Sequence, residues 1–194
     1  MLFYSARAVP AGILAAMIAA AAAPGVLANS LQLDVNDDAA RLGYAWLAAG
    51  DEVSLDVGAL HHQDTGNLLH AGLHLVDFAY GGATTLRAGL GGKLFLIDAD
   101  QGNSSGGALG LGGFVDYTFP DYDRLGAGGQ IYFAPDVLGL SDVESYREIS
   151  AYVRYNVLRS ADVYLGLRNL HAEFNDARDV TFDSGLHIGI RLEF

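Results

Sequence analysis

In several segments of this 194-residue chain, acidic and basic side chains fall on one of two alternating sets of positions, and apolar side chains fall on the other. Around Arg87, for example, Arg87 and Lys93 are at odd-numbered positions, and Leu86, Leu90 and Leu94 are at even-numbered positions. We call the set of alternating positions that holds the charges the charged parity, and the other set the apolar parity. Residues on the charged parity include Asp34, Asp56, Arg87, Lys93, Asp116, Arg154, Asp162, Arg168, Arg191 and Glu193. Gathered in a narrow, poorly hydrated space, such residues form a network of ion pairs. In a wider space they would line an aqueous channel.

Four histidines, His61, His62, His70 and His74, flank the sequence "QDTGN". If the two flanking segments pair about the centre of this loop, His62 faces His70 and His74 lies one inward step deeper. Imidazoles in that arrangement could bind a transition metal. No regularly spaced carboxylate or cysteine completes the set. We therefore predict neither a metal site nor a cofactor.

The residues that could act in hydrolysis are dispersed. A nucleophile and a base must lie within about 3 Å of each other and be oriented by a third group. The letters of G-x-S-x-G occur at residues 102–106, in a predicted loop between two strands, but neither a strand-to-helix nucleophile turn nor a paired-carboxylate arrangement stands out. The relevant side chains are Ser104, Ser105, Ser141, Ser145 and Ser184 in predicted loops, and His171 and His187 near the chain end. The sequence thus predicts a protein that is not an enzyme, with a lipid-modifying enzyme as an alternative.

The elements that position these residues are strands, because apolar residues alternate with period two almost throughout. Ten strands are predicted: Leu31–Val35, Arg41–Ala48, Glu52–His62, Leu68–Ala79, Thr84–Ile97, Ala108–Phe119, Arg124–Ala134, Arg147–Val157, Ala161–Leu170 and Gly185–Phe194. Most of them have about the 9–11 residues that cross a bilayer when tilted.

Short and long connections alternate along the chain. The links "AGD", "YGGA", "PDYD" and "RSA" are short, whereas "QDTGN", "DADQGNSSGG", "PDVLGLSDVES" and "HAEFNDARDVTFDSG" are longer. Outer-membrane barrels have short periplasmic turns and long extracellular loops. The pattern therefore predicts a closed, antiparallel transmembrane β-barrel of about ten strands in the outer membrane of a Gram-negative bacterium. Eight strands is the alternative, if Leu31–Val35 and one neighbour stay outside the sheet.

The alternation alone does not say which face meets lipid, but the aromatic residues do. Seven of them fall at strand ends assigned to the periplasm, where an interfacial girdle is expected: Trp46, Phe78, Tyr80, Tyr117, Phe119, Tyr155 and Phe194. A second group gathers at the opposite end: Phe133, Tyr146, Phe174 and Phe182. We therefore expect the apolar parity, with Leu90, Val153 and Ile190, to face lipid and the charged parity to face the lumen.

The N-terminal residues have the features of an export signal. Arg7 is followed by an apolar run, and Val26-Leu27-Ala28 fits a cleavage site. Residues 1–28 are predicted to be a signal peptide and residues 29–194 the barrel. The chain has no cysteine, which excludes thiol chemistry, and its net charge of -12 argues against nucleic acid as a partner. Glycine, at 25 residues, is interleaved with apolar residues, as in a bent or crowded sheet.

Two longer motifs carry a family resemblance. They are "YFAPDVL" (Tyr132 to Leu138) and "SYREISAYVRYNVLRSADVYLGLRNL" (Ser145 to Leu170), followed by a glycine-rich strand that ends in Phe194. In these motifs the chain resembles the YfaZ family of Gram-negative bacteria, described as predicted outer-membrane proteins. The resemblance implies the barrel fold and outer-membrane location, and it brings no catalytic residues.

The terminal Phe194 looks like the signal that the barrel-insertion machinery reads, so this machinery is an expected partner during assembly. Outer-membrane lipid and lipopolysaccharide are the other expected partners. Eight strands leave room only for side chains and sixteen leave a channel, so ten strands favour a narrow or plugged lumen. We expect a structural or interaction role, with a narrow channel for small solutes as the alternative.

Overall fold

The computed structural model of the protein describes residues 29–48, 52–81, 84–100, 104–175 and 178–194. The predicted signal peptide, residues 1–28, lies outside the described residues. None of the helical segments described is long and apolar enough to cross a bilayer.

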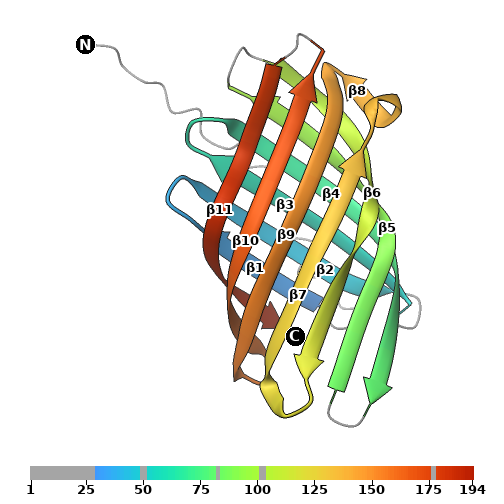
Figure 1. The fold of residues 1–194 in the computed structure, drawn as a ribbon, viewed down its shortest axis with the longest axis vertical. Helices are drawn as coiled ribbons and strands as arrows, with labels where there is room; N and C mark the ends of the chain where they lie inside the picture. The colour runs from blue at the N-terminus through green and yellow to red at the C-terminus, as the bar shows by residue number, and fades with distance from the viewer. Residues whose placement is uncertain (1–28, 49–51, 82–83, 101–103, 176–177) are drawn as a thin grey trace.

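The described chain is almost entirely strand (Figure 1). The elements are β1 (Asn29–Val35), β2 (Ala39–Ala48), β3 (Val53–His62), β4 (Gly66–Gly81), β5 (Thr84–Ala99), β6 (Ser104–Phe119), β7 (Tyr122–Ala134), the 3-10 turn η2 (Asp136–Leu138), β8 (Gly139–Ser141), β9 (Val143–Leu158), β10 (Ala161–Phe174) and β11 (Arg178–Glu193). Every pairing between these strands is antiparallel.

The sheet closes on itself as a barrel of ten strands. Neighbours in sequence pair in turn, β7 pairs with β9, and β1 pairs with β11. The seam is sealed where β1 begins, at the residue that follows β11: the amide of Asn29 donates to the carbonyl of Phe194 at 2.9 Å and the reverse bond is 3.0 Å. Hydrocarbon offers no partner to an open strand edge, so closure is required in a membrane. The predicted ten-stranded barrel is confirmed, and the short β8 adds to β6 outside the ring.

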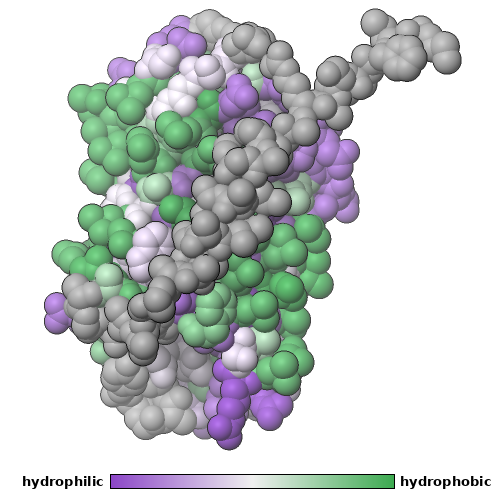
Figure 2. Space-filling view, turned by 180° about the vertical axis from the view of Figure 1, so that it is seen from behind, coloured by the Kyte–Doolittle hydropathy of each residue, from purple (hydrophilic) through white to green (hydrophobic). Residues whose placement is uncertain are grey.

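The apolar parity faces outward along the membrane-spanning parts of the strands. Leu90 is 75% exposed, Val153 52% and Ile190 45%. Hydrophobic side chains cover much of the barrel wall in Figure 2, and hydrophilic ones gather toward its ends. Large apolar side chains lie on a surface at this density when the surrounding medium is lipid. The predicted orientation of the two faces is therefore confirmed.

The strands run further than the sequence pattern predicts, and the connections are correspondingly shorter. The predicted loop "HAEFNDARDVTFDSG" is the clearest error, because β10 continues to Phe174 and β11 begins at Arg178. Five strands, β4, β5, β6, β9 and β11, have 16 residues each, more than the ~9–11 that cross a bilayer. Their ends away from the short turns therefore extend beyond the hydrocarbon.

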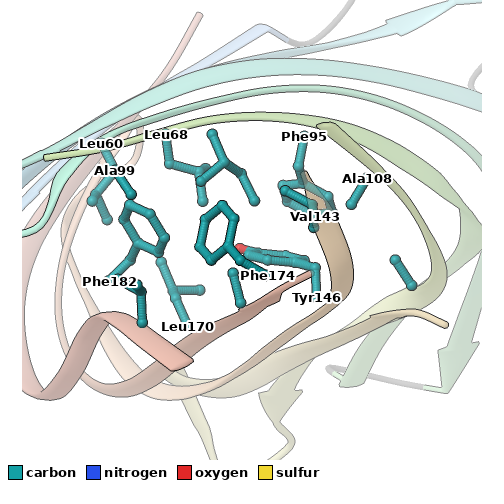
Figure 3. Close-up of a cluster of buried hydrophobic side chains, with 14 of the residues drawn as sticks. Leu60, Leu68, Phe95, Ala99, Ala108, Val143, Tyr146, Leu170, Phe174 and Phe182 are labelled. Atoms are coloured by element: carbon teal, nitrogen blue, oxygen red, sulfur yellow. The ribbon is translucent and has the colours of Figure 1, made fainter. Parts of the chain in front are cut away.

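The polarity of the wall is reversed in these outer ends. On β10, Leu170, Ala172 and Phe174 are buried inside the barrel, whereas His171 and Glu173 lie on the outside. We name the resulting cluster the outer plug (Figure 3). Its residues are Leu60, Leu68, Phe95, Ile97, Ala99, Ala108, Tyr132, Ala134, Val143, Tyr146, Leu170, Ala172, Phe174, Val180 and Phe182.

The outer plug corrects the prediction of a second aromatic girdle. Tyr146, Phe174 and Phe182 are inside the barrel and at most 1% exposed, and only Phe133 faces outward. A shift in register between Leu170 and His171 of β10 lets two successive residues of β11, Phe182 and Asp183, both be buried. Such a bulge changes which residues point inward and breaks the simple alternation of the strand.

The aromatics predicted at the periplasmic end divide between the two faces. Trp46, Tyr117, Phe119 and Tyr155 have the outward parity of their strands, and Phe194 ends the chain with 60% exposure. The predicted position of Phe78 in the aromatic girdle is wrong. This residue pairs in register with Arg87, which extends over its ring on the inward side, so Phe78 belongs to the lumen. The side chain of Tyr80 lies outside the described set.

Candidate functional site in the barrel lumen

Below the outer plug, toward the short turns, the lumen is polar and encloses a cavity of about 160 Å³. Glycines at Gly43 and Gly129 help to line it, together with Tyr152, Tyr164 and Gln130. Its lining reaches Ser30 near the start of β1 and Glu193 at the end of β11, which pair in register at the periplasmic mouth. The cavity is therefore a pocket between the plug and the mouth, and its wall is built largely from the charged parity of the strands.

Arg168 on β10 is the centre of the first ion-pair group. Its guanidinium donates to Asp34 of β1 at 2.6 Å and also makes a short contact with Asp183 of β11. These three side chains are at most 2% exposed. The hydroxyl of Tyr164 donates to the second oxygen of Asp34 at 2.9 Å. Burial of two carboxylates on one guanidinium requires this degree of pairing, since an unpaired charge is strongly disfavoured there.

Asp56 on β3 is the centre of a second group. Its carboxylate lies 3.1 Å from His70 Nε2, 3.2 Å from His74 Nδ1 and 3.6 Å from Lys93 Nζ. The other ring nitrogen of His74 is 2.8 Å from the hydroxyl of Tyr132, a member of the outer plug. A carboxylate, an imidazole and a phenol thus form a chain from the cavity to the base of the plug.

A third group extends the second group across the lumen through Lys93. Glu148 accepts from Arg41 at 3.3 Å and from the side-chain amide of Gln130 at 2.5 Å. Gln130 in turn accepts from Lys93 at 3.2 Å. The result is a belt of paired side chains that spans several strands.

The fourth group surrounds Asp116 near the mouth. Arg154 donates to both of its oxygens, and the hydroxyl of Tyr152 donates to Oδ2 at 2.6 Å. Arg191 lies 3.5 Å from Asp116 and 3.8 Å from Asp162, with its guanidinium over the ring of Tyr152. Asp116 is therefore surrounded by donors.

Arg87 is placed differently from the other lumen cations. Its guanidinium carbon lies 5.0 Å from the ring centre of Phe114 and 5.9 Å from that of Phe78. It pairs in register with Asp116, but Arg154 and Tyr152 occupy the oxygens of that carboxylate. Its Nε is buried without a hydrogen-bond partner.

The lumen therefore holds the predicted charged residues Asp34, Asp56, Arg87, Lys93, Asp116, Arg154, Asp162, Arg168 and Arg191, with Glu193 exposed at its mouth. Sequence reasoning missed Arg41, Glu148 and Asp183 as members of the network. Glu148 and Arg41 have the inward parity of their strands, a signal that was available. Asp183 was assigned to a loop, and the bulge in β11 breaks the alternation from which the inward direction of its side chain could have been predicted.

The predicted pairing of His62 with His70 is wrong. A tighter turn pairs His62 with Gly66 and His70 with Gly58. His61 instead lies on the exposed side, 2.9 Å from Asn67. The carboxylate that the sequence pattern lacked is Asp56, which the neighbouring strand brings to His70 and His74.

The expectation that the protein has no metal site stays a prediction. Among the described residues, the one group of three whose donor atoms all lie within 4.8 Å of one another is His171, Glu173 and Asp179, on the outside of β10 and β11. These side chains are largely solvent-exposed, and Glu173 accepts from Ser145 at 2.8 Å. Of the serines considered for catalysis, Ser184 accepts from Asn169 at 3.3 Å.

The sequence model of the family described as "YfaZ precursor" matches residues 8–194. A relative from Escherichia coli (strain K12), "Outer membrane protein YfaZ", is 30% identical over 135 residues, covering 69% of this chain and 71% of the relative.

Similar solved structures include the KdgM porin, at 13% identity and a TM-score of 0.42, with 86% of this chain and 99% of that chain covered. The NanC porin is 9% identical with a TM-score of 0.37, covering 87% and 100%. The outer membrane channel DcaP of Acinetobacter baumannii is 12% identical with a TM-score of 0.40, and the match spans 88% of this chain and 60% of DcaP.

Proposed function

Because the chain belongs to the YfaZ family and is an outer-membrane β-barrel, we propose that it has a structural or interaction role and does not conduct solutes. In this proposal the lumen is closed toward the outside and presents a polar pocket to the periplasm. The protein then acts through its outer surface and its periplasmic pocket.

The observation that carries the proposal is the outer plug. Phe95, Tyr146, Phe174 and Phe182 are each at most 1% exposed and fill the lumen between the strand ends. The rings of Phe95 and Tyr146 are in contact, with their centres 4.2 Å apart and their planes tilted by 39°. Close-packed aromatic side chains leave no continuous path for water, which hydrated ions and polar solutes need.

The polar part of the lumen supports the same proposal. Five of its cations, Arg41, Lys93, Arg154, Arg168 and Arg191, each have a carboxylate within ion-pair distance. Paired and hydrogen-bonded side chains that cross the lumen hold a fixed arrangement and leave few mobile charges to attract permeating ions.

Planar-bilayer conductance tests this proposal. The purified protein is expected to show no steady current above background, whereas Phe174→Ala combined with Phe182→Ala is expected to open intermittent currents by emptying part of the plug. Phe133→Ala, on the outward side of β7, is the matched control and is expected to remain silent. Steady currents from the unaltered protein would reject the closed lumen in favour of a narrow channel for small solutes.

The partners proposed for this role are those that a barrel of this kind meets. We propose that outer-membrane lipid contacts the apolar wall, that lipopolysaccharide surrounds the outer strand ends, and that the insertion machinery recognises the strand ending in Phe194. We further propose that the protein is not an enzyme. Mass spectrometry of lipid A from cells with and without the protein tests this, and an altered acyl pattern would overturn it.

A further inference from the structure

The further inference concerns Arg87, the lumen cation that lacks an ion pair. Six cationic side chains are buried or half-buried in the lumen of the described chain: Arg41, Arg87, Lys93, Arg154, Arg168 and Arg191. Five of them lie within ion-pair distance of a carboxylate, and among the described residues Arg87 has no such partner. Burial of an unpaired guanidinium is costly, so an anion is the chemical complement of this position.

The surroundings of Arg87 hold its guanidinium without satisfying its hydrogen bonds. Phe114 and Phe78 lie within about 6 Å of it and can stabilise its positive charge through their ring faces. Aromatic rings offer no acceptor for the N–H groups in the guanidinium plane. No hydrogen bond from Arg87 to the described residues is present, and its Nε is buried without a partner. The flat fork of donors is therefore free for a ligand.

The nearest carboxylate cannot serve as that ligand. Asp116 pairs with Arg87 in register, on the neighbouring strand. Its two oxygens already accept from Arg154 at 2.7 and 3.2 Å and from Tyr152 at 2.6 Å, and Arg191 approaches one of them at 3.5 Å. The four hydrogen bonds from Arg154 and Tyr152 already fill the approximately four lone-pair sites of a carboxylate.

The cavity supplies both space and access. Arg87 lines the same pocket of about 160 Å³, and so does His187, a residue 6% exposed whose Nδ1 has no hydrogen-bond partner. One water needs only about 10–15 Å³ of such space, so a molecule of several heavy atoms fits. The pocket lining also includes Ser30 and Glu193 at the periplasmic mouth, whereas the outer plug closes the other side.

We infer that the periplasmic pocket binds a small oxyanion, a carboxylate or a phosphate, on the guanidinium of Arg87. A planar guanidinium binds either group through two parallel hydrogen bonds, an arrangement that a lysine ammonium does not reproduce. This inference deepens the proposed function and rests on it for one point, the entry of the ligand from the periplasm.

Isothermal titration calorimetry of the folded protein in a non-ionic detergent at low ionic strength tests the site. The probes are inorganic phosphate and succinate, titrated separately so that the two chemistries are distinguished. At least one is expected to bind saturably, and Arg87→Gln is expected to weaken that binding by at least about tenfold, the loss of a charge-assisted pair. Arg147→Gln removes an exposed cation from the outer face of β9 and is expected to change the affinity less than about twofold.

Arg87→Lys keeps the charge and provides the second variant if Arg87→Gln does not fold, as judged by heat-modifiable gel mobility. It is expected to weaken succinate binding more than phosphate binding, because lysine binds phosphate as a point charge. Absence of saturable binding for both probes would overturn the inference, and so would binding that survives in both Arg87 variants.

Conductance measured on the same preparation separates this inference from the proposed function. Binding by a silent barrel supports both. Binding by a conducting barrel keeps the Arg87 site and rejects the closed lumen. A silent barrel that binds neither probe keeps the closed lumen and rejects the site.

Discussion

The outer ends of the strands and the membrane-spanning parts of the same strands are built with opposite polarity. In the membrane-spanning part of β10, Leu165 and Leu167 face outward, whereas Tyr164 and Arg168 are buried inside. Four to six residues beyond Arg168, Ala172 and Phe174 are inside, and Glu173 is outside. One continuous strand thus follows the rule of a membrane barrel and then the rule of a soluble one.

The reason is the solvent on the outside of the wall. Lipid accepts apolar side chains and rejects charges, so polar groups are confined to the lumen and must pair there. Beyond the headgroups water surrounds the wall, and the hydrophobic effect drives apolar side chains inward. The two regions differ in what holds them together: directional ion pairs in one, close packing in the other.

The largest effect is expected in the ion-paired region. Arg168→Met should lower the free energy of unfolding by about 3–5 kcal/mol, because Asp34 and Asp183 are left buried without their cation. Denaturant titration followed by heat-modifiable gel mobility measures the change. Arg168→Met combined with Asp34→Asn and Asp183→Asn should recover much of the loss. A loss below about 1 kcal/mol for the single variant would contradict the dependence on pairing.

The packed region should respond to the loss of volume. Phe174→Ala is expected to cost about 3 kcal/mol, because it leaves a cavity in the outer plug. The same titration measures it, with Phe133→Ala as the control on the outward face. Equal costs for the two variants would mean that the plug is not close-packed.

The boundary between the two regions can be located with a charge on the outward face of β10. Leu165→Arg, at a residue 56% exposed on the membrane-spanning part, should cost about 2–3 kcal/mol. Glu173→Arg, on the same strand and face but in the outer end, should change stability by less than about 0.5 kcal/mol. The measurement is reversible folding into lipid vesicles, and comparable costs at the two positions would place both in hydrocarbon.

The smallest effect concerns the backbone beside the outer plug. Ser141, at the end of β8, has a φ of 61°, in the left-handed region that disfavours residues with a Cβ. Ser141→Gly should raise the free energy of unfolding by about 0.5 kcal/mol, after subtraction of the greater flexibility of glycine in the unfolded chain. Ser105→Gly, in the extended β6, should lower it instead. Denaturant titration compares the two, and a loss in both would show that the turn is not strained.

Prediction from sequence succeeded where one repeated signal decided the outcome. The alternation of Leu186, Ile188 and Ile190 with His187 and Arg191 placed the second half of the last strand, and together with the loop lengths and the aromatic positions it gave the correct outward face. Prediction failed where the face that carries the apolar side chains changes along a strand, from the outside of the barrel to the inside. Phe174 and Phe182 were assigned to a girdle because the pattern was interpreted with lipid outside throughout, and Phe78 was assigned outward from its position near a strand end.

The lumen network was only partly predictable for a related reason. Parity says that Asp56 and Arg168 point inward, and the structure places them there. Partners depend on register and on the bulge in β11, which are set by contacts between strands far apart in sequence. Asp34 and Arg168, for example, meet across β1, β11 and β10.

The sequence by itself determined a barrel of about ten strands with an apolar wall toward lipid. Side-chain direction in a strand has a period of two and is a local property, and the loop lengths and aromatic positions then indicated which face meets lipid. Only the tertiary structure decided where the outer plug lies, which charges pair and that Arg87 is left without a carboxylate. Those outcomes depend on closure of the sheet and on the shear between strands, which bring residues together at distances that no local pattern encodes.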